Sequence, residues 1–327
     1  MLTIRPFRNE DPPKLLEIWQ RLYRDRKRPH FIPMSMADLD CGPLGMPLFD
    51  HRFIQLAFRD DQPVGFAQIG FGPNTDGSDL SSEVGHIAVV AVVPDCLEPV
   101  DVCKELIVAG ENVLTAAGVR KIFGGSPHPC LPFYLGLYGG AEPIGIFDSD
   151  EPVVEAFQQL GYEIRQKTIH FQRELINYKP PMHLNDLQWK DKIVLQVDDV
   201  PIAKNWWDAL SLAHNEWLEF TAVLTENSMR VAQVRVRLSL PGPDKIQRVF
   251  DNDWDAALTD IRVHPNFHRK GLGTFVLGIV LRFLSRENRA ARIEAHIADD
   301  HSTVYRLLRA LDWEEVETGN LFYKNVH

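Results

Sequence analysis

Two adjacent cations and two glycines form the segment of this chain whose residue types are best suited to chemistry. Arg269 and Lys270 are followed by Gly271 and Gly273. Glycine has no Cβ, so the backbone can approach a ligand closely at these positions. The free N–H groups and the dipole at a helix start also attract an anion. The segment therefore predicts a phosphate-binding turn, with a plain basic surface turn as the alternative.

The flanking elements must hold this turn in place. Residues 256–263 have the character of a strand, and residues from 271 onward have that of a helix. Apolar residues recur there at steps of three and one, which places them on one helix face. They are Leu272, Phe275, Val276, Ile279, Val280, Phe283 and Leu284. A dinucleotide fingerprint is excluded because Val276 stands where a third glycine is needed, and no segment fits a P-loop.

The whole turn, from Val263 to Gly273, has the pattern Val-x-Pro followed by His-Arg-Lys-Gly-Leu-Gly. It resembles the acyl-CoA pyrophosphate loop of the GNAT N-acetyltransferase superfamily, although His268 stands where Arg or Gln is usual. The resemblance implies acetyl-CoA as co-substrate, and no metal. It also implies a set of cofactor-binding residues. These are Ile261, Arg262, Val263, His268, Arg269, Lys270, Gly271, Leu272, Gly273 and Thr274.

The resemblance further implies a general acid. GNAT enzymes often carry a tyrosine on the helix after their fifth strand, about eight residues before a Gly-Phe-like turn, and it protonates the departing thiolate. Tyr305 lies eight residues before Trp313 and is the candidate. The alternative is an ordinary tyrosine at the edge of an apolar helix face. The positions of the family's frequent Asn and Glu are occupied here by Ala298 and Ala257.

The general base is not identified by a motif. Asp260 is the candidate catalytic base, and it lies near the end of the expected strand 256–263, which leads into the turn. Asp255, Glu294 and His296 are nearby alternatives, and water molecules that relay the proton are another. The twelve histidines are scattered along the sequence, so we expect no metal cluster.

The chain contains an internal repeat. Leu160-Gly161-Tyr162 matches Leu311-Asp312-Trp313 at an offset of 151 residues, and Val92-x-Pro94 matches Val263-x-Pro265 at an offset of 171. The difference means that the first half has about twenty extra residues. We place them in the glycine- and proline-rich stretch 124–147, which is long enough to be a functional loop or lid.

The two copies differ at the phosphate turn. At the offset of 171, the counterpart of the turn contains Glu98, Pro99 and Asp101 and no glycine. The two acids would repel a pyrophosphate, and proline offers no N–H. Tyr305 corresponds to Val154, which has no proton to donate. The first half is therefore predicted not to bind acetyl-CoA, which gives one cofactor per chain.

Composition narrows the class of protein. The 327 residues suit two domains, and 45% hydrophobic and 24% charged residues are typical of a soluble globular protein. No apolar run reaches membrane-span length, and the N-terminus lacks a signal-peptide pattern. Four cysteines without metal or redox spacing indicate free thiols and a cytoplasmic location. The formal net charge of −10 argues against a nucleic-acid partner and weakly favours a cationic small substrate.

The fold class expected is α/β (α+β), with two GNAT-like domains, each a mixed, mostly antiparallel sheet flanked by helices. We expect a degenerate domain at residues 1–176 and a catalytic domain at residues 191–327. Residues 177–190 are expected to form the linker between them. This tandem layout is similar to that of mycothiol synthases, without implying their substrate. The function implied is acetyl transfer from acetyl-CoA to a small-molecule amine by direct attack in a ternary complex. The alternatives are a non-catalytic acyl-CoA sensor and a protein N-acetyltransferase, and the acceptor and the oligomeric state stay open.

Overall fold

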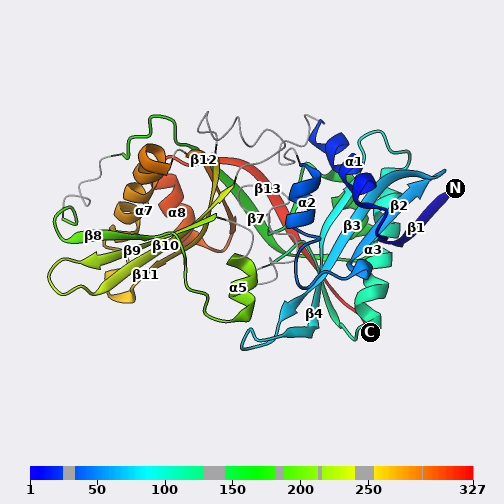
Figure 1. The fold of residues 1–327 in the computed structure, drawn as a ribbon, viewed down its shortest axis with the longest axis horizontal. Helices are drawn as coiled ribbons and strands as arrows, with labels where there is room; N and C mark the ends of the chain where they lie inside the picture. The colour runs from blue at the N-terminus through cyan, green and yellow to red at the C-terminus, as the bar shows by residue number, and fades with distance from the viewer. Residues whose placement is uncertain are drawn as a thin grey trace.

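The computed structural model describes residues 1–24, 34–127, 144–181, 188–212, 216–239, 254–288 and 290–326 (Figure 1). The first half contains, in order, β1 (Leu2–Pro6), α1 (Pro12–Tyr23), α2 (Met36–Cys41), η1 (His51–Phe53), β2 (Ile54–Arg59), β3 (Gln62–Pro73), β4 (Leu80–Val92), α3 (Pro99–Ala116), β5 (Lys121–Gly124), β6 (Ile146–Phe147), α4 (Glu151–Gln159) and β7 (Glu163–Glu174). The second half contains β8 (Ile193–Asp198), α5 (Trp206–Leu212), β9 (Glu216–Leu224), β10 (Arg230–Ser239), β11 (Trp254–Val263), η4 (Pro265–Phe267), α7 (Leu272–Phe283), η5 (Leu284–Asn288), β12 (Ala290–Ala298), α8 (Ser302–Ala310) and β13 (Glu314–Asn325).

The strands form one continuous mixed sheet rather than two separate ones. Its order is β1-β2-β3-β4-β5-β13-β7-β12-β11-β10-β9-β8, with β6 paired to β13. Most neighbours are antiparallel, while β4 with β5 and β11 with β12 are parallel. The predicted fold class of mixed sheets flanked by helices is confirmed. The domain and linker boundaries stay predictions.

The internal repeat is visible in the backbone. A β-bulge lies at Ala88, where the β3–β4 register skips one residue, and another at Thr259, where the β10–β11 register does the same. These positions are 171 residues apart. The starts and ends of α4 and α8, and of β7 and β13, are instead 151 residues apart. The extra residues of the first half therefore lie between β5 and α4, as the sequence predicted; most of that segment, 128–143, is outside the described residues.

The last strand of each half pairs with strands of the other half, so that β7 and β13 exchange places. In Figure 1, β7 (green) and β13 (red) run together through the centre of the molecule. β7 lies between β13 and β12, and β13 lies between β5 and β7. Phe171 on β7 is buried in the core of the second half, and Phe322 on β13 is buried in that of the first. Each half therefore completes its core with a strand from the other.

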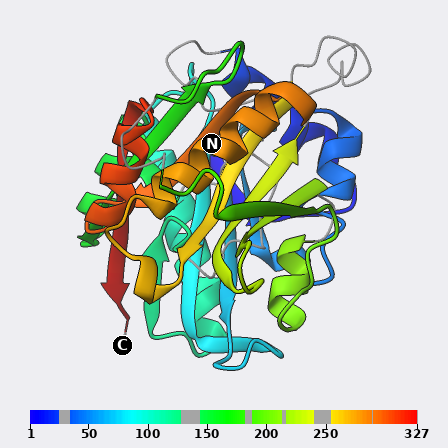
Figure 2. The ribbon, with the colours of Figure 1, turned by 90° about the vertical axis from the view of Figure 1, so that its left-hand side faces the viewer.

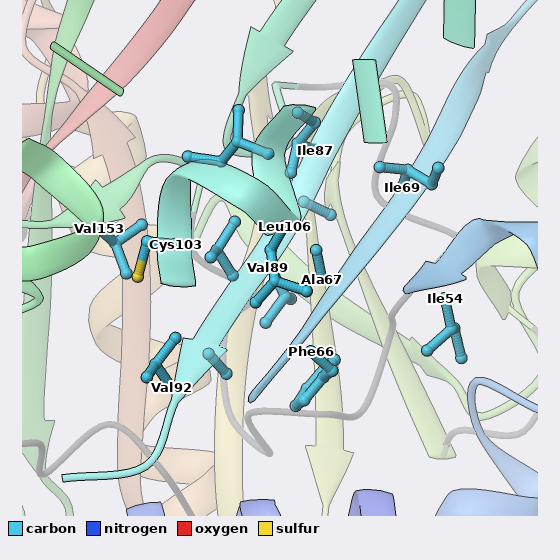
Figure 3. Close-up of a cluster of buried hydrophobic side chains, with 14 of the residues drawn as sticks. Ile54, Phe66, Ala67, Ile69, Ile87, Val89, Val92, Cys103, Leu106 and Val153 are labelled. Carbon is cyan, nitrogen blue, oxygen red and sulfur yellow. The ribbon is translucent and has the colours of Figure 1, made fainter. Parts of the chain in front are cut away.

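The first-half core is built where α3 and α4 pack on the sheet. Ile69 of β3 and Ile87 of β4 lie against Gly110 of α3, and Leu106 of α3 lies over Gly65 of β3. Figure 3 labels Ile69, Ile87 and Leu106 within this buried cluster. β3 and β4 are buried almost throughout their centres. Such long apolar runs are expected of strands covered on both faces. The buried face of α1 is formed by four apolar side chains, Leu15, Ile18, Trp19 and Leu22.

The second-half core is formed under α7. Leu272, Val276 and Val280 of the predicted face are buried, but so are Leu277 and Leu281, which the periodicity did not select. α7 is apolar around most of its circumference, so the spacing alone could not define its buried face. Figure 2 shows α7 (orange) lying along the strands of the second half.

Other features are local. The 3-10 turn η1 leads directly into β2, and the short helix α2 lies between α1 and η1. The Ser35 hydroxyl caps α2 in a capping box with Asp38. In the described part of the chain, Cys41, Cys96 and Cys103 are free thiols, and no helix has the length and apolarity needed to cross a membrane. Cys130 and residues 240–253 lie outside the described residues.

Candidate functional site

The turn between β11 and α7 has the backbone of an anion site. Arg269 and Gly271 both adopt positive φ, at 58° and 75°, and Gly271 is the N-cap of α7. The first helical hydrogen bond runs from the Phe275 N–H to the Gly271 carbonyl. The N–H groups of residues 272–274 precede that bond, so they point out of the helix start, where an anion would be bound.

Neighbouring side chains hold this turn in place through contacts with its backbone carbonyls. The Trp189 indole N–H and the Gln188 amide both donate to the Lys270 carbonyl, at 3.0 and 2.9 Å. The His268 Nε2 lies 2.7 Å from the Val263 carbonyl, across the base of the turn. His268 therefore closes the loop at the one position where the sequence departs from the GNAT pattern. Protein groups thus fix the conformation of the turn through hydrogen bonds to its backbone.

Two cationic side chains lie on the turn. Arg269, Lys270 and His268 are exposed, and the positive end of the α7 dipole adds to the guanidinium and ammonium groups. The Lys270 ammonium also lies 5.7 Å from the centre of the Phe267 ring. This combination suits a ligand with several negative charges.

Beside the turn, two parallel strands separate. β11 pairs with β12 only from Trp254–Ala290 to Ala257–Glu294. Beyond this point β11 continues along β10 as far as Val263, with the bulge at Thr259 at the start of the free stretch. The backbone of residues 261–263 therefore has one edge that β12 does not occupy. This is the stretch that the resemblance assigns to aligning the cofactor.

Gly273 has a packing role that sequence reasoning missed. A Cβ at this position would lie 2.9 Å from Leu307 Cδ1 and 3.4 Å from Val263 Cγ2. A side chain at position 273 would therefore displace the end of Leu307, so glycine eases the approach of α8 to the start of α7. Gly271 needs its positive φ. Substituting both glycines would therefore disturb the fold as well as the turn, and charge substitutions test the site more cleanly.

The structure places Tyr305 on α8, where its side chain contacts the last strand of each half. Its ring packs edge-on against Phe171 of β7, with centroids 5.6 Å apart, and its hydroxyl donates to Glu315 of β13 at 2.7 Å. Leu307, two residues further along α8, is the side chain that faces Gly273. The hydrogen bond to Glu315 raises the pKa of Tyr305. The role of Tyr305 as general acid stays a prediction, and it requires the side chain to leave Glu315.

Asp260 lies on β11 just beyond the bulge. Ile261 and Val263 pack on the second-half core under α7, so Asp260 and Arg262 project from the opposite sheet face. Their carboxylate and guanidinium are 2.7 Å apart. Of the alternative bases, Glu294 and His296 lie on β12, while the side chain of Asp255 is outside the described residues.

The first half has the same backbone bend without the donors. Glu98 adopts a φ of 54° at the position equivalent to Arg269, and α3 begins at Pro99. The Glu98 carboxylate is paired with Arg59 at 3.3 Å, and Arg59 also donates to the Leu97 carbonyl. The bend is therefore occupied by an internal ion pair, as expected for a copy that does not bind an anion.

Residues 186–313 match the acetyltransferase (GNAT) family. The second half of the chain is a GNAT domain. GNAT proteins are N-acetyltransferases, so the domain places the protein among the acyltransferases. No protein of curated function matches the chain by sequence.

Solved structures share the fold over the whole chain. A tandem GNAT protein from the clavulanic acid biosynthesis pathway is 13% identical and superimposes with a TM-score of 0.66, covering 99% of this chain and 98% of that one. A GCN5-related N-acetyltransferase from Sphaerobacter thermophilus is 13% identical with a TM-score of 0.67, covering 99% and 95%. A glucosamine N-acetyltransferase region of a fungal multi-domain β-N-acetylglucosaminidase is 14% identical with a TM-score of 0.66, covering 99% and 38%. The tandem GNAT architecture is thus shown by fold.

Proposed function

We propose that this protein transfers an acetyl group from acetyl-CoA to the amine of a small-molecule acceptor, with both substrates bound together. The observation that carries the proposal is the braced, cationic turn at the start of α7, next to the point where β11 and β12 separate. The pyrophosphate of the cofactor fits the N–H groups of 272–274 with Arg269 and Lys270. The backbone of 261–263 would hold the pantetheine arm.

Within this proposal the acceptor approaches from the sheet face opposite α7. The amine nitrogen attacks the thioester carbonyl, the carbon–sulfur bond breaks, and the thiolate leaves and takes up a proton, for which Tyr305 is the proposed donor. The amine loses a proton, for which Asp260 is the proposed acceptor because it projects from that face. Its ion pair with Arg262 orients the carboxylate. Positioning the two reactants supplies much of the rate in such a reaction.

The first half would shape this acceptor side. Asn205, just before α5, donates to the Asp76 carbonyl at 3.1 Å, and the Trp207 N–H donates to the Gly77 carbonyl at 3.0 Å. These bonds fix α5 to the β3–β4 hairpin of the first half. From α5, Asp208 pairs with Arg235, which lies opposite Asp260 in the β10–β11 register. The first half thus supports the face from which Asp260 projects.

Replacing Tyr305 with phenylalanine is expected to lower kcat and to keep the affinity for acetyl-CoA within a few-fold. The reason is that only the hydroxyl, the proposed proton donor, is removed, while the packing of the ring on Phe171 remains. Steady-state kinetics with a saturating amine provides the measurement. Removing a general acid typically costs ~10²–10⁴-fold, and the cost is smaller where the thiolate leaves readily. An unchanged kcat under conditions where chemistry is rate-limiting would contradict the role of Tyr305 as the acid.

The proposal is tested by incubating the protein with acetyl-CoA and a panel of small amines and following the release of free thiol. Amine-dependent thiol release above the rate of the protein without amine supports it. Binding of acetyl-CoA without turnover of any amine would favour the acyl-CoA sensor, and acetylation of lysine peptides alone would favour a protein acetyltransferase.

A further inference from the structure

Two histidines and a glutamate from different halves meet on the central strands. His170 of β7 lies directly opposite His296 of β12 in the antiparallel register. Their rings are stacked, with centroids 4.3 Å apart and planes at 9°. Glu294 lies two residues before His296, and therefore on the same sheet face. This face is opposite the one on which Ile293 and Ala295 pack into the second-half core.

The ligand-type atoms of the three side chains converge. One ring nitrogen or carboxylate oxygen from each lies within 4.8 Å of the others. The Nε2 atom of His170 is 3.5 Å from Oε2 of Glu294. Both side chains are largely buried, at 10% and 13% exposure. The His170 Nε2 atom is fully buried and makes no hydrogen bond, which is costly for a polar atom.

We propose that His170, Glu294 and His296 bind a divalent transition metal of the zinc class. Two imidazole nitrogens and one carboxylate are a set that Zn²⁺ uses, leaving a fourth position for water or a ligand. Zinc bonds to nitrogen and oxygen of about 2.0–2.2 Å at tetrahedral angles separate the two donors by about 3.3 Å. The observed 3.5 Å between His170 and Glu294 is close to this spacing.

An apolar ring and a cation border the three side chains. Phe147 lies against both imidazole rings, at 5.9 Å from His170 and 5.7 Å from His296, and covers them with an apolar surface. The Arg292 guanidinium approaches the other carboxylate oxygen, Oε1 of Glu294, at 3.5 Å. It therefore orients the carboxylate, as a neighbour of a metal ligand commonly does, while Oε2 stays toward His170.

The site would join the two halves of the chain. β7 belongs to the first half in sequence, and β12 to the second. A metal bound to both strands would hold β7, the last strand of the first half, against β12 of the second half. The fourth coordination position of the metal would lie on the sheet face from which Asp260 projects. This inference does not depend on acetyl transfer.

The test is a titration of the full-length chain, without a histidine tag and stripped of metal, with Co²⁺ and then with Zn²⁺ in competition. We expect visible d–d absorption typical of a four-coordinate Co²⁺ site, one equivalent bound, and displacement by Zn²⁺. Because even indirect neighbours of a metal commonly contribute 10–100-fold to affinity, His296→Ala and Glu294→Gln should each weaken binding at least about 100-fold.

The matched control is His301→Ala, which removes an exposed histidine outside the cluster. It should bind Co²⁺ as the unaltered protein does. Circular dichroism establishes that each variant is folded, and Glu294→Gln keeps the side-chain volume if the histidine variant does not fold. The proposal is overturned if the unaltered protein shows no d–d absorption, or if Glu294→Gln and His301→Ala bind Co²⁺ equally well.

Discussion

Reversing the charge of Arg269 and Lys270 by substituting glutamate for both is expected to weaken acetyl-CoA binding roughly 100-fold without affecting folding. Each cation in contact with a phosphate contributes about 1 kcal/mol in water, so reversing two changes the energy by about 4 kcal/mol before salt screening. About 3 kcal/mol remaining after screening corresponds to roughly 100-fold in affinity. Both side chains are exposed, so no core contact is lost.

The backbone should tolerate these substitutions. Arg269 has a positive φ, but Glu98 adopts nearly the same φ at the equivalent position of the first half. The matched control reverses Arg120 and Lys121, an adjacent and exposed Arg-Lys pair in the first half. It changes the net charge by the same amount. Calorimetric titration compares the two, and equal weakening by both variants would mean that overall charge, rather than the turn, governs binding.

Replacing Phe322 with alanine is expected to destabilise the protein by about 3–5 kcal/mol, the usual cost of removing a fully buried phenylalanine. Phe322 lies near the C-terminus, yet it stacks on Phe157 in the first-half core, with centroids 5.1 Å apart and planes at 12°. The loss should therefore appear in the first half. Denaturant unfolding gives the size of the effect, and hydrogen exchange gives its location.

Phe171→Ala is the reciprocal variant, because Phe171 belongs to the first half in sequence and packs in the second-half core. We expect faster exchange in β2 and β3 for Phe322→Ala, and in β10 and β11 for Phe171→Ala. If each variant instead loosened only its own half of the sequence, the strand exchange would be wrong.

Much of the architecture could be predicted from local signals. The offset between Val92 and Val263 was readable because a Val-x-Pro pair ends a strand in both halves, and the bulges at Ala88 and Thr259 have the same spacing. The phosphate-binding turn could be predicted because all of its residues are contiguous in sequence. Its glycines and cations fall within five residues, and the local chain conformation positions them.

The rest depends on contacts between distant residues. The sequence cannot show that β7 and β13 change places, because each half has the pattern of a complete domain. His170 and His296 are 126 residues apart and meet only through that exchange, so the histidines seemed scattered. The orientation of the Tyr305 side chain is set by Glu315 on β13, which follows α8, and the side chain that lies against Gly273 is Leu307. Neither partner is marked by a motif.

The central claim is that the second half alone holds the cofactor, at the start of α7. Its most direct test is an isothermal titration of the intact chain with acetyl-CoA, from which the binding ratio is read. The account predicts one acetyl-CoA per chain, because the first half replaces Arg269 with Glu98 in the same backbone bend and begins its helix with Pro99. A ratio near two would show that the first half also binds, and an absence of binding would remove the α7 turn as a cofactor site.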